Sequence, residues 1–111
     1  MKIDQARAFA LSQPNTTEEP HFAFSSFRVG GRIFATVPPG DTILHIFVPD
    51  EEREAALAVE PEVTEKLFWG AKVVGVRIHL AKARKAFVER LLAAAYAYQA
   101  AKKPARPRKK A

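Results

Sequence analysis

The pair Gly30-Gly31, flanked on both sides by β-prone residues, constrains the fold of this chain more than any other feature of its sequence. A two-residue type I′ turn needs positive φ at both central positions, which glycine adopts without steric strain. The pattern therefore predicts a tight hairpin over residues 27–37, in which Phe27 faces Phe34 across the ladder.

The two faces of this predicted hairpin differ in character. Phe27, Val29 and Phe34 form one apolar side, which needs a covering layer. Arg28 and Arg32 point to opposite faces in the same register, so they do not form one basic cluster. A bulged, longer loop would shift this register.

Composition points to one domain without covalent cross-links. The chain has 111 residues, no internal repeat and no cysteine, which excludes disulfides, thiol catalysis and thiolate zinc sites. No apolar run approaches the ~18 residues of a membrane span, and the N-terminus lacks a signal-like apolar segment. We therefore expect a cytoplasmic protein without membrane association, with one domain over residues 1–101 and a tail over residues 102–111.

The excess of positive charge lies at the C-terminal end of the chain. The formal net charge is +6, and residues 102–110 hold six lysines and arginines with no acidic residue. Residues 1–101 are therefore formally neutral, although their cations concentrate after residue 65. Pro104 and Pro107 within the basic run predict a disordered tail that attracts polyanions without sequence preference.

Apolar periodicity and turn residues predict three helices and an antiparallel sheet. Asp4 and Asp50 are the predicted N-caps of the first two helices, and residues 15–20 are interpreted as a polar connector. The helices are expected over residues 5–13, 51–59 and 83–101, and the strands beyond the hairpin over residues 42–48 and 73–80, with residues 62–69 ambiguous between helix and strand.

This order of elements predicts a two-layer α+β sandwich in which the helices pack on one face of the sheet. The strand over residues 42–48 is apolar on both faces except at His45, which favours a central position. The strand over residues 73–80 alternates, with Arg77 and His79 on its polar face. One face of the sheet is therefore core, and the other looks outward.

Three histidines, His21, His45 and His79, lie on or beside predicted strands. They lack the short spacing of a helical metal motif, so no metal and no other cofactor is predicted. Together with Glu18 and Trp69 they are candidates for one pocket, where a carboxylate beside an imidazole would serve ligand binding or acid–base chemistry. Unrelated structural or surface roles for these residues are the alternative interpretation.

Cations on the hairpin and on the outward sheet face are candidates for phosphate contacts. This set comprises Arg28, Arg32, Lys72 and Arg77, with Lys102 and Lys103 of the tail adding non-specific attraction. Trp69, beside a glycine, would offer a stacking surface for a base. A solvated sheet face carries the same residue types, so both interpretations stay open.

Nucleophile and phosphate-binding motifs are missing from the sequence. It has no G-x-S-x-G elbow, no S-x-x-K and no G-x-x-x-x-G-K-[ST] loop. Gly30-Gly31 is not a phosphate loop either, since no helix is predicted to begin after it. We therefore expect no catalytic residues and a non-catalytic role.

Three blocks of the sequence resemble the MmcQ/YjbR family: residues 17–22, 27–37 and 69–78. The resemblance covers nearly all of residues 3–100, and it implies an α-β(3)-α-β(2)-α fold similar to secretion chaperones and CyaY-like proteins. It also favours a short strand at residues 67–69. Members are described as DNA-binding proteins with a double-wing arrangement, and the family implies no catalytic residues.

Three functional hypotheses follow. The first is a DNA-binding protein that contacts phosphates through the hairpin, sheet and tail cations. The second is a small-ligand or peptide-binding module whose pocket gathers Glu18, His21, His45 and Trp69. The third is a protein-interaction module that pairs through an edge or a face of its sheet.

Overall fold

The computed structural model describes residues 1–102, and the predicted tail from Lys103 onward lies outside these described residues. Their chain order alternates helical and extended segments. The elements are α1 (Ile3–Ser12), β1 (Thr16–His21), β2 (Phe24–Val29), β3 (Arg32–Val37), β4 (Ile43–Phe47), α2 (Asp50–Val59), β5 (Thr64–Trp69), β6 (Lys72–His79), the short 3-10 helix η1 (Leu80–Lys82) and α3 (Lys85–Ala100).

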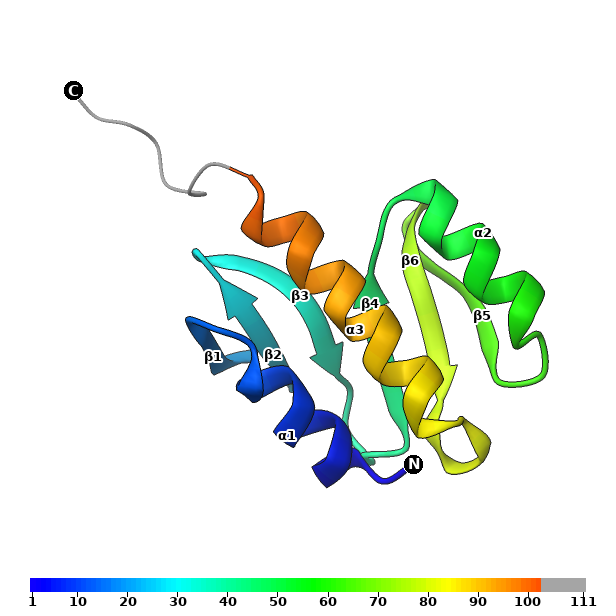
Figure 1. Ribbon diagram of the computed structural model, residues 1–111, viewed down its shortest axis with the longest axis horizontal. Coiled ribbons are helices and arrows are strands. Elements are labelled where there is room, and N and C mark those ends of the chain that lie inside the picture. The colour runs from blue at the N-terminus through cyan, green and yellow to red at the C-terminus, as the bar shows by residue number, and fades with distance from the viewer. Residues whose placement is uncertain (103–111) are drawn as a thin grey trace.

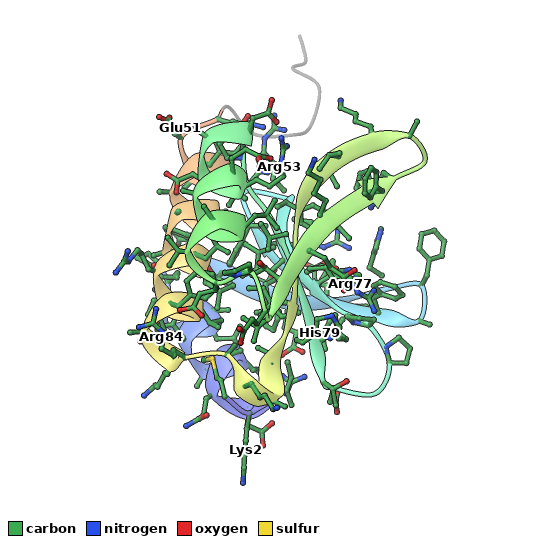
Figure 2. All side chains as sticks on the ribbon, turned by 90° about the vertical axis from the view of Figure 1, so that its right-hand side faces the viewer. Lys2, Glu51, Arg53, Arg77, His79 and Arg84 are labelled. Atoms are coloured by element: carbon green, nitrogen blue, oxygen red, sulfur yellow. The ribbon has the colours of Figure 1, made fainter. Side chains whose placement is uncertain are left out.

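The strands form one antiparallel sheet of six strands in the order β1-β2-β3-β4-β6-β5. Figure 1 shows the three helices on one side of this sheet, with α3 running diagonally across its middle. Within the described residues no helix covers the opposite side, which we call the open face (Figure 2). The predicted two-layer α+β sandwich, with helices on one sheet face, is confirmed.

The core lies between the sheet and the helices. The central strands supply Phe34, Ile46 and Ile78, each fully buried, because alternate residues of a strand point to one face. Leu92 on α3 is buried in the same cluster, and the rings of Phe34 and Tyr96 meet edge-to-face at 5.7 Å. The helices therefore cover the apolar side of the sheet.

The predicted glycine turn is present, with a change of register beyond it. Gly30 and Gly31 adopt φ values of 59° and 79° and join β2 to β3. A bulge interrupts the ladder, so Phe27 pairs with Ala35 rather than with Phe34, and the predicted pairing is wrong at that point. Phe34 is the extra residue on its strand. A bulge changes the direction of the side chain at the extra residue, so Phe34 is buried although it no longer pairs with the buried Phe27.

The segment predicted to be a polar connector is instead an edge strand. β1 pairs antiparallel with β2, so Glu18 faces Phe27 and Pro20 faces Ser25. Proline is tolerated at the edge of a sheet because no further strand needs its missing N–H. Charged residues and proline lower the apparent strand propensity of such an edge, which explains the wrong prediction. The ambiguous residues 62–69 contain the opposite edge strand, β5.

The predicted cap of the first helix is wrong. α1 begins at Ile3, so Asp4 lies within its first turn, where its charge suits the helix dipole. The earlier start coincides with anchoring of the chain terminus. The amine of Met1 donates to the carbonyl oxygens of Leu80 and Ala83 at 2.9 and 3.2 Å. These residues lie far from Met1 in the sequence, so local sequence does not predict the contact.

The other two helices also start at different residues than predicted. Asp50 is the first residue of α2 rather than its cap, and Pro49 takes the cap position. α3 begins at Lys85 rather than at residue 83, because η1 and a short extended stretch precede it. None of the helices within residues 1–102 is long and apolar enough to cross a membrane.

Candidate functional site on the open face of the sheet

A row of polar side chains crosses the open face. Strand register places one residue from each strand in this row: Glu19, Ser26, Thr36, His45, Arg77 and Glu65. Each step of the row is a cross-strand pair, so neighbouring side chains point to the same side of the sheet. Figure 2 shows Arg77 and His79 on the side away from the helices.

His45 lies at the centre of this row and is buried, with 8% of its surface exposed. Its Nδ1 lies 3.4 Å from Thr36 Oγ1, and its Nε2 lies 3.5 Å from a terminal nitrogen of Arg77. Burial, followed by the positive charge of Arg77, lowers the pKa of His45 to about 4, against a smaller raising effect of Glu65. The ring is therefore neutral at pH 7, with Nε2 accepting from Arg77 and Nδ1–H donating to Thr36.

Arg77 is held only loosely by its neighbours. Its Nε lies 3.6 Å from Glu65 Oε2, beyond hydrogen-bonding distance, and 39% of the Arg77 side chain is exposed. The same Glu65 oxygen lies 2.6 Å from His79 Nε2, so the carboxylate is drawn toward the imidazole instead. The guanidinium of Arg77 is thus a cation on the open face without a short contact to an anion.

Beside this row lies a hollow of about 420 Å³, which we call the aromatic hollow. Its lining residues come from five of the six strands and from the turn between β1 and β2: His21, Phe22, Phe24, Thr36, His45, Phe47, Leu67, Phe68 and Trp69. The lining includes no Lys, Arg, Asp or Glu. Clefts of about 300–1,000 Å³ with mostly apolar walls and a few polar groups are typical of small-molecule sites.

Exposed aromatic rings form the rim of the aromatic hollow. Phe22 is 92% exposed, and its φ of 59° is uncommon for a bulky residue. Its ring meets that of His21 edge-on at 4.9 Å. Phe68 and Trp69, 53% and 60% exposed, end β5 just before the turn at Gly70. Large apolar side chains that are exposed together mark interaction sites rather than core.

A glycine is required in the strand ladder beside the aromatic hollow. Gly75 pairs with Phe47 on one side and with Leu67 on the other, and both of these line the aromatic hollow. A Cβ at Gly75 would lie 2.1 Å from the carbonyl oxygen of Ile46, so only glycine fits this position. Phe47 in turn packs against Trp69, with ring centroids 5.4 Å apart.

The structure brings together part of the predicted pocket. His21, His45 and Trp69 all line the aromatic hollow, as the second hypothesis expected of them. Glu18 does not, because it points to the helix side, where its carboxylate accepts from Arg7 at 3.1 Å. His79 lies further along the open face, bound to Glu65. Two of the three histidines therefore converge, and the third does not.

The predicted phosphate-contacting cations do not form one cluster. Arg28 lies on the open face, where its Nε donates to Ser26 Oγ at 2.9 Å and lies 4.0 Å from a Glu19 oxygen. Arg32 pairs with buried Val29, which places it toward the helix side. Lys72, another of the cations predicted to contact phosphates, is the first residue of β6.

Lys72 and Lys102 border a second hollow of about 330 Å³ at the end of the sheet, shared with Trp69 and Tyr98. The amine of Lys102 lies 4.2 Å above the ring of Tyr98. Lys103 is outside the described residues. This second hollow also contains Asp50, so its charges partly cancel.

Sequence reasoning missed most of the aromatic lining. Phe22, Phe24, Phe47 and Phe68 were not among the predicted site residues, because their faces depend on the register of strands far apart in the chain. The adjacent pair of Phe68 and Trp69 before a glycine was the available signal, since two large rings next to each other in a strand cannot both be buried on one face.

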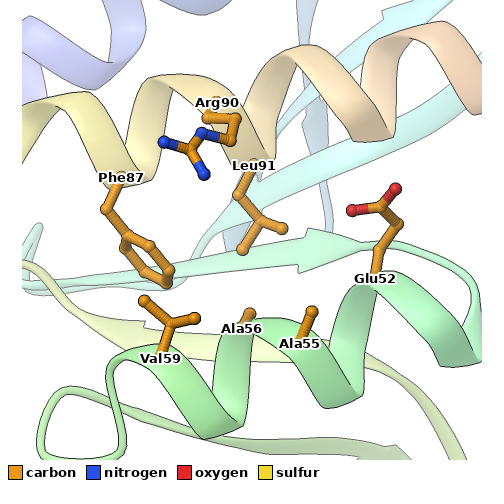
Figure 3. A pocket seen from close by; sticks show the side chains of 7 residues that line it. All are labelled: Glu52, Ala55, Ala56, Val59, Phe87, Arg90 and Leu91. Carbon is orange, nitrogen blue, oxygen red and sulfur yellow. The ribbon is translucent and has the colours of Figure 1, made fainter.

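The rest of the described surface offers no second site of this size between its helices. A hollow of about 90 Å³ lies between α2 and α3, where Phe87 and Leu91 face Ala55 and Val59 (Figure 3). This volume is well below the ~300 Å³ of small-molecule sites, so it is a gap in helix packing. The described residues contain no group of three or more His, Cys, Asp or Glu side chains arranged to hold a metal ion.

A helix-backed antiparallel sheet with an aromatic open face defines a small α+β protein of the kind expected from the resemblance above. The sequence profile of the YjbR family matches residues 11–98, and this chain therefore belongs to the YjbR family. The crystal structure of Deinococcus radiodurans protein DR2400, with the domain DUF419, superimposes with a TM-score of 0.73 at 20% identity, over 86% of this chain and 75% of that one. That similarity establishes a shared fold. No protein with a curated description matches the chain.

Proposed function

We propose that this YjbR-family protein is a non-catalytic binding module that holds the apolar, aromatic part of a small ligand in the aromatic hollow. The hollow supports this proposal through its size of about 420 Å³ and its uncharged lining. Exposed Phe22, Phe68 and Trp69 at its rim add to this support, because soluble proteins rarely gather large apolar side chains on one surface without a partner.

The single tryptophan of the chain, Trp69, lines the hollow and reports binding directly. Titration with a neutral aromatic probe, 3-phenylpropanamide, is expected to change the fluorescence of Trp69 saturably and to raise the melting temperature with probe concentration, because a ligand that binds the native state stabilises it. Absence of both changes at millimolar concentrations of this amide and of the corresponding acid, 3-phenylpropionate, would contradict the proposal.

A matched pair of variants localises the site. Phe22→Ala removes a rim ring that is 92% exposed, so it is expected to leave the fold intact and to weaken probe binding several-fold. Leu11→Ala removes another exposed apolar side chain, from α1 in the helix layer, and is expected to leave probe binding unchanged. Equal effects of the two variants would place the probe elsewhere.

DNA is the second candidate partner. Arg28 and Arg77 both project from the open face, and residues 102–110 carry six further cations. All of these side chains are of the kind that contacts phosphates. Trp69 lies between the two hollows and would stack on a base. This candidate requires Arg28 and Arg77 to exchange their nearby carboxylates, Glu19 and Glu65, for phosphates.

Fluorescence anisotropy with a labelled duplex tests this second candidate. The full chain and a chain ending at residue 101 are compared over a series of salt concentrations, because each phosphate contact adds to the salt dependence. If the open face reads DNA, the shortened chain retains salt-sensitive binding, and Arg28→Gln and Arg77→Gln weaken it further. If the shortened chain does not bind at low salt, the basic residues 102–110 are responsible instead.

A further inference from the structure

Arg77 is a cation beside the aromatic hollow, next to one of its lining residues. One of its terminal nitrogens lies 3.5 Å from Nε2 of His45, and His45 lines the hollow. Two other arginines have shorter contacts: Arg28 reaches Ser26 at 2.9 Å, and Arg53 reaches Asp50 at 2.6 Å. The two side-chain contacts of Arg77, at 3.5 and 3.6 Å, leave its N–H donors poorly satisfied by comparison.

The polar edge of the aromatic hollow is rich in donors. Thr36 contributes a hydroxyl and lines the hollow beside His45, while Arg77 contributes a fixed positive charge behind them. No carboxylate belongs to the lining, so the only contacts of these donors with a lining residue are the long ones to the neutral ring of His45, at 3.4 and 3.5 Å. A group that complements this edge must accept hydrogen bonds, and a negative charge on it gains from the guanidinium.

We propose that the ligand of the aromatic hollow is an aromatic carboxylate, with its ring among the rim and wall aromatics and its carboxylate bound by Arg77. This inference rests on the function proposed above and adds the charge of the ligand to it. The ring contacts Phe24, Phe47 and Trp69, which surround the hollow on three strands. The carboxylate extends past His45 to the guanidinium of Arg77, which lies beside His45 and outside the lining of the hollow.

Within residues 1–102, Glu65 is the anion close enough to compete for Arg77. Its oxygen lies 3.6 Å from Nε of Arg77, and the same oxygen lies 2.6 Å from His79. The guanidinium has five N–H donors in a planar fork, so a ligand carboxylate takes the terminal N–H groups while Glu65 stays near Nε. His79 keeps its hold on Glu65 in this arrangement, and no residue of the row needs to leave its place.

Two probes of the same shape test the inference. 3-Phenylpropionate carries the carboxylate, and 3-phenylpropanamide is its neutral counterpart. Titrated against the full chain at pH 7, with Trp69 fluorescence as the readout, the acid is expected to bind about tenfold or more tightly than the amide, since a hydrogen bond to a charged group is worth about 1.5–3 kcal/mol. Raising the salt concentration is expected to narrow this preference.

Three variants assign the preference to a residue. Arg77→Gln is expected to remove the preference for the acid. The affinity for the acid falls to that for the amide, whereas the affinity for the amide stays the same. Arg77→Lys keeps the charge without the planar fork and is expected to retain part of the preference. Arg90→Gln removes an exposed arginine of α3, in the helix layer, and is expected to keep the preference in full.

The outcomes separate this inference from the proposed function. Equal affinity of the two probes for the full chain overturns the inference and leaves a neutral-ligand site standing. Absence of binding by both probes overturns the inference and the proposed function together. A tenfold preference that survives in Arg77→Gln also overturns the inference, because the carboxylate is then held by another group. The comparison of acid and amide on the unaltered chain does not depend on the folding of any variant.

Discussion

Replacing His45 by glutamine is expected to remove a large part of the acid sensitivity of the folded protein. His45 has a folded-state pKa of about 4 against an ordinary value of 6.5, because burial and the charge of Arg77 disfavour the imidazolium. The unfolded chain therefore binds a proton at this residue in the pH range between these values, and the native state does not. Stability contributed by the neutral ring is present above pH 6.5 and is lost as the pH falls toward 4.

The magnitude follows from linkage. Between pH 7 and pH 4.5, a shift from 6.5 to about 4 lowers the free energy of unfolding by about 2 kcal/mol through this residue alone. Arg77 contributes to the lowered value and Glu65 opposes it. The quantity of interest is the difference in pH dependence between the natural chain and His45→Gln, because contributions that the two chains share cancel in it.

Urea unfolding followed by Trp69 fluorescence at pH 7 and pH 4.5 measures this difference. The natural chain is expected to lose about 2 kcal/mol more between the two pH values than His45→Gln does. A constant cost of the substitution cancels, because it is present at both pH values. His21→Gln, which removes another histidine of the aromatic hollow, controls for a general effect of losing an imidazole. Parallel pH dependence of the natural chain and His45→Gln would refute the assignment of a neutral, buried His45.

Gly75→Ala is expected to destabilise the fold by about 2 kcal/mol in urea unfolding, because its Cβ would lie 2.1 Å from the Ile46 carbonyl oxygen in the central ladder; stability equal to that of the natural chain would contradict this steric account. Phe22→Gly is expected to raise the free energy of unfolding by about 1 kcal/mol, since glycine adopts the φ of 59° without strain, while probe binding falls; unchanged binding would remove Phe22 from the site. Tyr96→Phe is expected to cost about 1 kcal/mol in the same assay through the lost hydrogen bond of 2.8 Å to the Pro14 carbonyl, and no loss would show that water replaces it.

The local chemistry of the chain determined its fold class. Gly30-Gly31 specifies a hairpin because both residues need positive φ, and both have it in the structure. Alternation between residues 73 and 80 specifies a strand with an apolar and a polar side, because side chains of a strand point alternately to its two faces. These signals depend only on neighbours in sequence, so they could be predicted.

The candidate site was decided by the tertiary structure. The edge strand β1 forms because β2 supplies its hydrogen-bonding partner, and the bulge between β2 and β3 turns the side chain of Phe34 toward the core. Neither feature could be predicted from the residues of the strand concerned. Strand register makes neighbours of His45, Arg77 and Glu65. Local strand propensity carries no information on this register, because the three residues lie far apart in the sequence. The aromatic hollow likewise combines residues from five strands, so it exists only when the whole sheet has formed.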